Sequence, residues 1–179
     1  LLGGNVQYTT GAGAGTITFS TTLNSTGSAR SLTMIAGTGN IDLDGIVGAN
    51  LALGVVGITS AANVTADAAI TAASLTQSAG SGTTTLTGLV TTSGVTNIAA
   101  ATIVQTAAIN AGDAVSLTGA VTSVGNITTT NDNITFTGAV LLGGNVQYTT
   151  GAGAGTITFS TTLNSTGSAR SLTMIAGTG

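Results

Sequence analysis

The sequence predicts an all-β protein whose short strands wind into a parallel β-solenoid. Three observations predict this fold: a composition dominated by small residues, a long exact repeat, and a shorter alternating pattern inside that repeat. Gly, Thr, Ala and Ser occupy 108 of the 179 positions, and Pro is absent. Internal repetition at a fixed period is typical of architectures in which each unit stacks on the next.

The long repeat is exact. Residues 1–39 recur without one change as residues 141–179, which sets a 140-residue period. We therefore interpret residues 1–140 as one full repeat unit and residues 141–179 as the start of the next identical unit. No linker composition marks the passage from Val140 to Leu141, and we expect the chain to be a window of a longer continuous array.

Inside the unit, seven segments follow one seven-residue template, in which apolar residues at positions 1, 3 and 7 alternate with polar or small ones. Alternation at period two, with many β-branched residues, indicates β-strands. The template returns at unequal steps, the shortest being the 12-residue step from Ile103 to Val115, and it begins again at Ile157. The mean step predicts a roughly 20-residue coil and seven coils per unit. The segments are residues 17–23, 41–47, 64–70, 84–90, 103–109, 115–121 and 134–140.

A coil of this length is too small to bury a core alone. When coils stack, their inward side chains form one continuous column, and equivalent strands pair in parallel at about 4.8 Å. Seven spacings predict a rise of roughly 34 Å per unit, with negligible helix. The residues predicted to point inward include Ile17, Phe19, Leu43, Leu86, Leu117 and Phe136.

Asparagine marks the expected corners between strands. Seven Asn residues directly precede an apolar residue, and Asn tolerates left-handed backbone geometry at turns. Stacked Asn side chains also form hydrogen-bonded ladders along a solenoid axis, which is the interpretation we favour. The alternative is that Asn and Gly only mark loops. The residues are Asn5, Asn40, Asn63, Asn97, Asn126, Asn133 and Asn145.

The two identical segments allow a further prediction. In a stack where each coil contacts only its neighbours, identical sequence meets nearly identical surroundings, except at the ends. We therefore expect residues 1–39 and 141–179 to form the same strands at equivalent solenoid positions, displaced along one axis.

Composition argues against most enzyme chemistry. The chain has no His, Cys, Lys or Glu, which removes the usual nucleophile triads, zinc sites and Schiff bases. With a net charge of -3 and two Arg residues, binding to a phosphate backbone is not expected. No apolar run approaches the roughly 20 residues of a membrane helix. We assign no catalytic, cofactor-binding or metal-binding residue, and we expect neither a cofactor, nor a nucleic-acid partner, nor a membrane span.

The template points Asp42, Asp44 and Asp67 outward and stacks Asp44 beside Asp67 on adjacent coils. Paired carboxylates serve in glycoside hydrolysis, and a Ca²⁺ ion can bridge them. The catalytic interpretation lacks supporting residues, since few aromatic side chains are present to stack on a sugar. We favour simple solvated surface acids over a structural Ca²⁺ bridge, and both over catalysis.

The template also predicts a threonine stripe on the outer surface. Regular Thr ladders occur on the ice-binding faces of some antifreeze proteins, which makes ice binding a remote alternative. The unequal coil lengths and the interrupting Asp residues disfavour it, and Thr also packs well on exposed β surfaces. The stripe comprises Thr18, Thr65, Thr85, Thr87, Thr106, Thr118, Thr135 and Thr137.

One stretch resembles a known family. Residues 31–48, with echoes at 117–121 and 136–140, are similar to the β-strand repeats of very large bacterial surface proteins. These are the filamentous haemagglutinin-like and autotransporter-type adhesins. The resemblance implies an extracellular β-helix on a bacterial cell surface.

Only 4% of the residues are charged, so the surface is mostly hydroxyl, methyl and backbone, which suits lateral packing of like against like. We therefore expect a structural extracellular fibre that acts by self-association into filaments or bundles. The alternative is the shaft of an adhesin whose binding domain lies elsewhere. Neither residues 1–3 nor residues 176–179 contain a capping pattern, and we expect the chain to continue beyond both.

Overall fold

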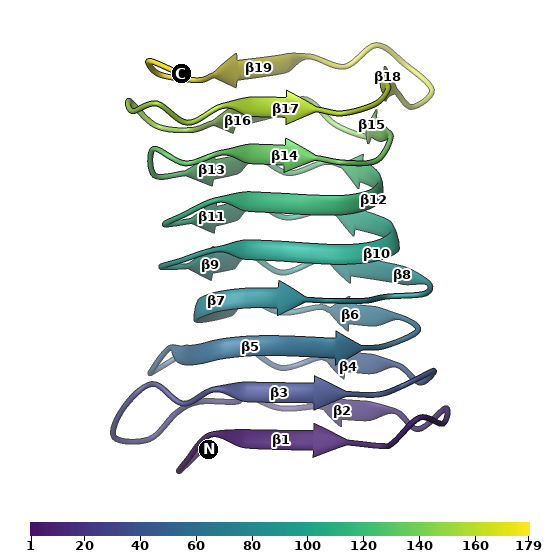
Figure 1. The fold of residues 1–179 in the computed structure, drawn as a ribbon, viewed down its shortest axis with the longest axis vertical. Helices are drawn as coiled ribbons and strands as arrows, with labels where there is room; N and C mark the ends of the chain where they lie inside the picture. The colour runs from purple at the N-terminus through teal and green to yellow at the C-terminus, as the bar shows by residue number, and fades with distance from the viewer.

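The computed structural model describes residues 1–179 and confirms the predicted fold. The chain forms 19 β-strands and no helix, and every strand pairing is parallel. Successive coils stack along one axis, with the two chain ends at opposite ends of the column (Figure 1). No helix is present that could cross a membrane. The predicted architecture, a parallel β-solenoid with roughly 20-residue coils, is therefore correct.

The strands stack in three columns, which we call the first, second and third faces in the order in which the chain visits them. The first face is the one toward the viewer in Figure 1. It contains β1 (Val6–Thr9), β3 (Leu32–Ile35), β5 (Leu53–Ser60), the later part of β7 (Ile70–Gln77), the early parts of β10 (Thr96–Gln105) and β12 (Val115–Ser123), β14 (Ile134–Phe136) and β17 (Ile157–Phe159).

The second and third faces lie behind the first. The second face contains β2 (Ile17–Phe19), β4 (Ile41–Leu43), β6 (Val64–Ala66), β8 (Thr83–Leu86), the later parts of β10 and β12, β15 (Val140–Leu142) and β18 (Leu163–Ser165). The third face contains single-residue bridges at Leu23 and Val47, the start of β7, then β9 (Val90–Thr92), β11 (Ile109–Ala111), β13 (Ile127–Thr129), β16 (Val146–Thr149) and β19 (Leu172–Ile175).

The core is a column of inward side chains from all three faces. It forms one cluster of 35 buried hydrophobic residues that runs through the stack. Five of the six predicted inward residues are buried: Ile17, Leu43, Leu86, Leu117 and Phe136. Phe19 is only half-buried and packs against the cluster, because it lies in the first coil and has no coil beneath it.

The fifth position of the template, where four of the seven segments have Gly, lies at a corner where the backbones of adjacent coils approach closely. Gly119, where β12 turns from the first face to the second, has a φ of 130°, a left-handed value that side chains disfavour. A Cβ atom on Gly119 would overlap the carbonyl oxygen of Ala100 in the coil below. Contact between coils therefore favours a small residue at this position, and at Gly119 the local backbone geometry favours glycine as well.

The strand pairing gives the winding of the unit more closely than the sequence did. From β1 on the first face to its copy β16 on the third, the chain takes twenty steps between faces. With three faces a turn, the 140-residue unit makes six and two-thirds turns, each slightly longer than the predicted coil. At about 4.8 Å per coil the unit rises about 32 Å, close to the roughly 34 Å predicted from seven whole coils.

The missing third of a turn arises at one place in the sequence. The template at residues 103–109 begins on the second face, because Ile103 pairs with Thr84, whereas the template at 115–121 begins on the first face, because Val115 pairs with Thr96. The 12-residue step between these two templates therefore spans two faces, while each of the other, longer steps spans three.

The two identical segments confirm one part of their prediction and correct the other. Three pairs of strands match: β1 and β16, β2 and β17, β3 and β19. The fourth strand of the second copy, β18, corresponds to residues 23–25, which form only single-residue bridges in the first copy. Their positions are not related by displacement along the axis alone, however. Each copied strand lies two faces further along the winding, so that β2 is on the second face and β17 on the first. The predicted simple displacement is wrong because the unit does not contain a whole number of turns.

Candidate assembly surfaces

The two end coils expose side chains that are core residues elsewhere. In β1 at the amino-terminal end, Tyr8 lacks a coil beneath it and is 41% exposed. In β19 at the other end, Met174, whose copy Met34 is fully buried, is 55% exposed. The strands of the end coils are each paired on one edge only: β1 and β2 at the amino-terminal end, and β17, β18 and β19 at the other.

The passage from one unit to the next is marked by a cluster of aromatic rings. Phe136, near the end of the first unit, stacks on Phe159 of the second with ring centroids 4.9 Å apart and planes 3° apart. The ring of Tyr148 lies 5.2 Å from Phe136 and 6.1 Å from Phe159. Offset stacked and tilted arrangements of this kind add about 0.5–1.5 kcal/mol per pair beyond burial.

This junction uses every aromatic residue of the unit. The unit contains only Tyr8, Phe19 and Phe136, and the last of these meets the copies of the first two. At the amino-terminal end, Tyr8 and Phe19 contact each other edge to face at 5.4 Å, with no third ring. The full cluster therefore forms only where two successive units meet. Sequence analysis missed the cluster because its members are far apart in the unit, although their scarcity was a visible signal.

Burial has a clear effect on the Tyr148 hydroxyl. Desolvation raises the pKa of Tyr148 to about 12, and the nearby Ser123 side chain offsets part of the rise. Ser123 donates its own proton to Gln105 Oε1 at 2.5 Å, and Tyr148 Oη is left without a well-formed hydrogen bond. A buried hydroxyl without a partner is costly, so this part of the junction is held by ring packing.

Asparagine side chains connect coils, but not as the predicted ladder. In most cases an Asn Oδ1 accepts a backbone N–H from the next coil, as Asn5 does from Ser31 at 2.9 Å and Asn133 from Thr156 at 2.8 Å. Only one hydrogen bond joins two Asn side chains, from Asn63 Nδ2 to Asn40 Oδ1 at 3.1 Å. The continuous ladder does not form because the Asn residues are divided among the corners of three faces. Among the seven predicted residues, Asn97 lies within β10 and not at a corner.

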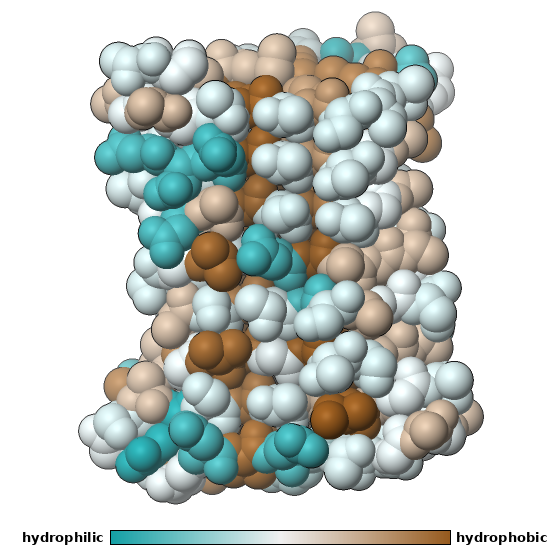
Figure 2. All heavy atoms as spheres, in the orientation of Figure 1, coloured by the Kyte–Doolittle hydropathy of each residue, from teal (hydrophilic) through white to brown (hydrophobic).

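The predicted threonine stripe is likewise divided. Thr18, Thr65 and Thr85 lie on the second face, with Asp42 between the first two, whereas Thr118 and Thr135 lie on the first. Its remaining members follow the same division: Thr87 and Thr106 continue the second-face segments, and Thr137 the first-face segment. The cause is the two-face step after residue 109. Figure 2 shows the first face, covered mostly by side chains of intermediate hydropathy, with strongly hydrophilic ones in a few groups.

The aspartates take the predicted outward positions. Leu43 pairs with Ala66, which places Asp44 and Asp67 at neighbouring positions on adjacent coils of the second face, both exposed. Asp42 lies between Thr18 and Thr65 in the same face. No group of three or more potential metal-ligating side chains occurs in the structure. These three residues form an acidic patch confined to one face of the unit.

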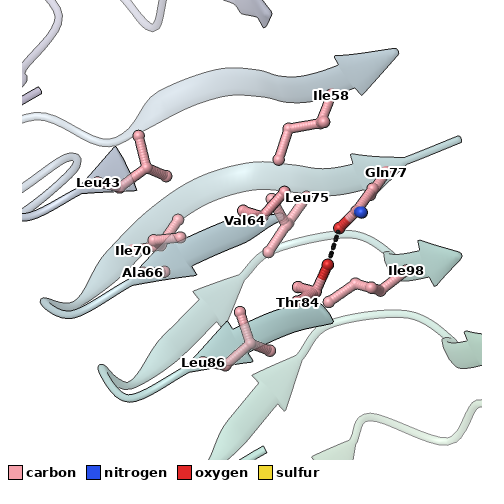
Figure 3. Close-up of a pocket in the computed structure, with 10 residues that line it drawn as sticks. All are labelled: Leu43, Ile58, Val64, Ala66, Ile70, Leu75, Gln77, Thr84, Leu86 and Ile98. Carbon is pink, nitrogen blue, oxygen red and sulfur yellow. Dashed lines mark hydrogen bonds between the residues drawn. The ribbon is translucent and has the colours of Figure 1, made fainter. Parts of the chain in front are cut away.

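The interior holds one cavity, shown in Figure 3, with a volume of about 10 Å³. It lies among apolar side chains beside a buried hydrogen bond, which Thr84 Oγ1 donates to Gln77 Oε1 at 2.8 Å. This is about the space of one water molecule and too little for a ligand. Two shallow grooves at the corners are lined mainly by Ala, Thr and Ser. They offer no charged group and few large apolar anchors of the kind that fix small ligands.

Comparisons with protein-family models, with curated proteins and with solved structures found no match to this chain.

Proposed function

We propose that this protein is a structural fibre protein that acts by self-association, with the 140-residue unit as its building element. The observation that carries the proposal is that one copy of the unit continues into the next without a break: Phe136 of the first unit packs against Tyr148 and Phe159 of the second, and strands of the two units pair in parallel. The last coils of one unit are therefore complementary to the first coils of the next. Stacking one unit on the next buries apolar area and pairs strand edges at the same time.

The outer faces support the same proposal. They carry hydroxyl and methyl groups and few charges, since the chain has five Asp and two Arg residues in all. A low surface charge leaves little electrostatic repulsion between copies of one chain. We further propose that the fibre lies outside a bacterial cell, on the basis of the similarity of residues 31–48 to the repeats of bacterial surface proteins.

The experiment is to measure the mass of the 179-residue chain by sedimentation velocity over a wide concentration range. The proposal expects the mean mass to rise with concentration and elongated particles to form. Met174→Asp should reduce end-to-end association, because burying an unpaired carboxylate against another coil is costly. Met174→Leu, which keeps an apolar side chain, is the matched control and should associate like the unaltered chain.

Circular dichroism of each variant establishes that its strands are intact. A chain that stays a dispersed monomer at high concentration, while unfolding cooperatively, would contradict the proposed function and favour the adhesin shaft instead. Association that is equal in Met174→Asp and Met174→Leu would show that the ends are not the contact.

A further inference from the structure

Each unit is one-third of a turn short of seven turns. This shortfall determines on which face of a longer array each surface feature lies. A strand of one unit and its copy in the next lie on different faces, as β2 and β17 show. Strands of the first face move to the third face in the next unit: β1 and β3 recur as β16 and β19. Identical sequence repeats this relation at every junction.

We propose that successive units of an array present each surface feature on a different face in turn, so that the array contacts further copies of itself on all three sides. Three units then make twenty whole turns. The unit rise is about 32 Å, and the pattern on any one side repeats after about 96 Å. The inference rests on the proposed function, because it concerns how arrays pack side by side.

The acidic patch of Asp42, Asp44 and Asp67 gives this rotation a consequence for packing. All three residues lie on the second face of their unit. Without rotation the patch would recur on that face at every unit, and the face would repel an identical neighbour. Two faces would remain for contact, which favours flat sheets.

With rotation, each face carries the patch in one unit of three and is free of it in the other two. The Debye length at physiological ionic strength is about 8 Å, far less than the rise of one unit. Patches on neighbouring arrays therefore do not repel when the arrays are offset by one unit. The partner is thus a second copy of the array, docked on any of three sides with its patches offset along the axis.

The experiment uses a continuous array of nine units with Thr118→Cys in each unit. The unaltered chain has no Cys, and Thr118 is exposed on the first face, so one gold cluster can be attached per unit. Electron microscopy then gives the label spacing along single arrays and the arrangement of arrays in assemblies. A second array, which also carries Asp42→Asn, Asp44→Asn and Asp67→Asn, is the control for the offset.

The proposal expects labels about 96 Å apart on each side, three-dimensional bundles, and an axial offset of one unit that is lost in the Asn array. Labels along a single side, about 32 Å apart, would overturn the rotation while leaving fibre formation intact. Flat sheets one array thick, or an offset that the Asn substitutions leave unchanged, would overturn the three-sided contact. Arrays that stay separate would overturn the proposed function itself, whatever their label spacing.

Discussion

The two identical segments of this chain have the same sequence and different surroundings. In the first, Met34 is fully buried between β1 and β5; in the second, the same residue, Met174, is 55% exposed at the end of the stack. Tyrosine shows the reverse: Tyr8 is 41% exposed, whereas Tyr148 is fully buried. The first segment lacks a coil beneath it and the second lacks a coil above it.

Both segments keep the same side-chain hydrogen bonds within a coil. Thr10 Oγ1 donates to the carbonyl oxygen of Gly15 at 3.0 Å, and its copy Thr150 donates to Gly155 at the same distance. The comparison therefore separates two levels of the fold. Local sequence determines strands and corners, while burial, and with it most of the stability, depends on the neighbouring coil.

The largest expected effect is at the aromatic junction. Tyr148→Ala removes a buried ring that packs against Phe136 and Phe159, and large-to-small changes of aromatic residues in a core cost about 3–5 kcal/mol. Tyr8→Ala, the same substitution in the first segment, should cost much less because Tyr8 is partly exposed. Urea unfolding of both variants measures the difference, and equal losses would refute the neighbour-dependent account.

For methionine the buried copy is in the first segment, Met34, and the exposed copy is in the second, Met174. Met34→Ala should lower the free energy of unfolding by about 2–5 kcal/mol, because it leaves a cavity in the core. Met174→Ala should change it by less than about 0.5 kcal/mol, as is usual for exposed positions. Thermal unfolding at a concentration where the chain does not associate checks both values. A larger loss for Met174→Ala than for Met34→Ala would invert the account.

The pH dependence of stability tests the burial of Tyr148 in another way. Its pKa is raised from 10.0 to about 12 in the folded chain, so the unfolded chain ionises first. Stability should be unaffected by this group below about pH 10 and fall as the pH rises from 10 to 12, by roughly 2–3 kcal/mol. The Tyr148→Phe variant should lack this decline, which a series of denaturant titrations would show. A decline that persists in the variant must come from other groups.

The smallest expected effect concerns a single hydrogen bond between coils. Asn24 Oδ1 accepts the backbone N–H of Asn50 in the next coil at 2.9 Å. Asn24→Ala leaves that N–H unpaired, which should cost about 1–3 kcal/mol, at the low end if water reaches it. Asn164→Ala, the matched change in the second segment, removes an exposed side chain and should be nearly neutral. Hydrogen exchange at the Asn50 amide should speed up only in Asn24→Ala.

Sequence alone predicted the fold class, the coil length and most of the inward residues. It could do so because alternation is a local property, and Leu43, Leu86 and Leu117 each lie within one strand. Phe19 is less buried than predicted only because its coil has no neighbour beneath it. The 12-residue step between the templates at 103 and 115 also carried the missing third of a turn, since so short a step cannot complete a coil.

Other features could not be predicted because they depend on which coil lies next to which. The division of the Thr stripe, the absence of an Asn ladder and the meeting of Phe136 with Tyr148 all follow from the face on which each segment lies. Polar residues in the interior were missed for a related reason. Gln105 occupies an apolar position of the template, and its partner Ser123 lies one coil further along.

The most direct test of the winding is a disulfide between outward positions of adjacent coils. The structure pairs Asn97 with Ser116 on the first face, whereas seven whole coils per unit would place Ser116 beside Val104. Neighbouring parallel strands lie about 4.8 Å apart, within the Cα separations that a disulfide accepts. Because the chain has no Cys of its own, each pair can be introduced alone.

Under mild oxidation of the dilute folded chain, Asn97→Cys with Ser116→Cys should form an intramolecular disulfide rapidly, and Val104→Cys with Ser116→Cys should not. Rapid closure of the second pair, with none in the first, would contradict the six and two-thirds turns per unit on which the account depends.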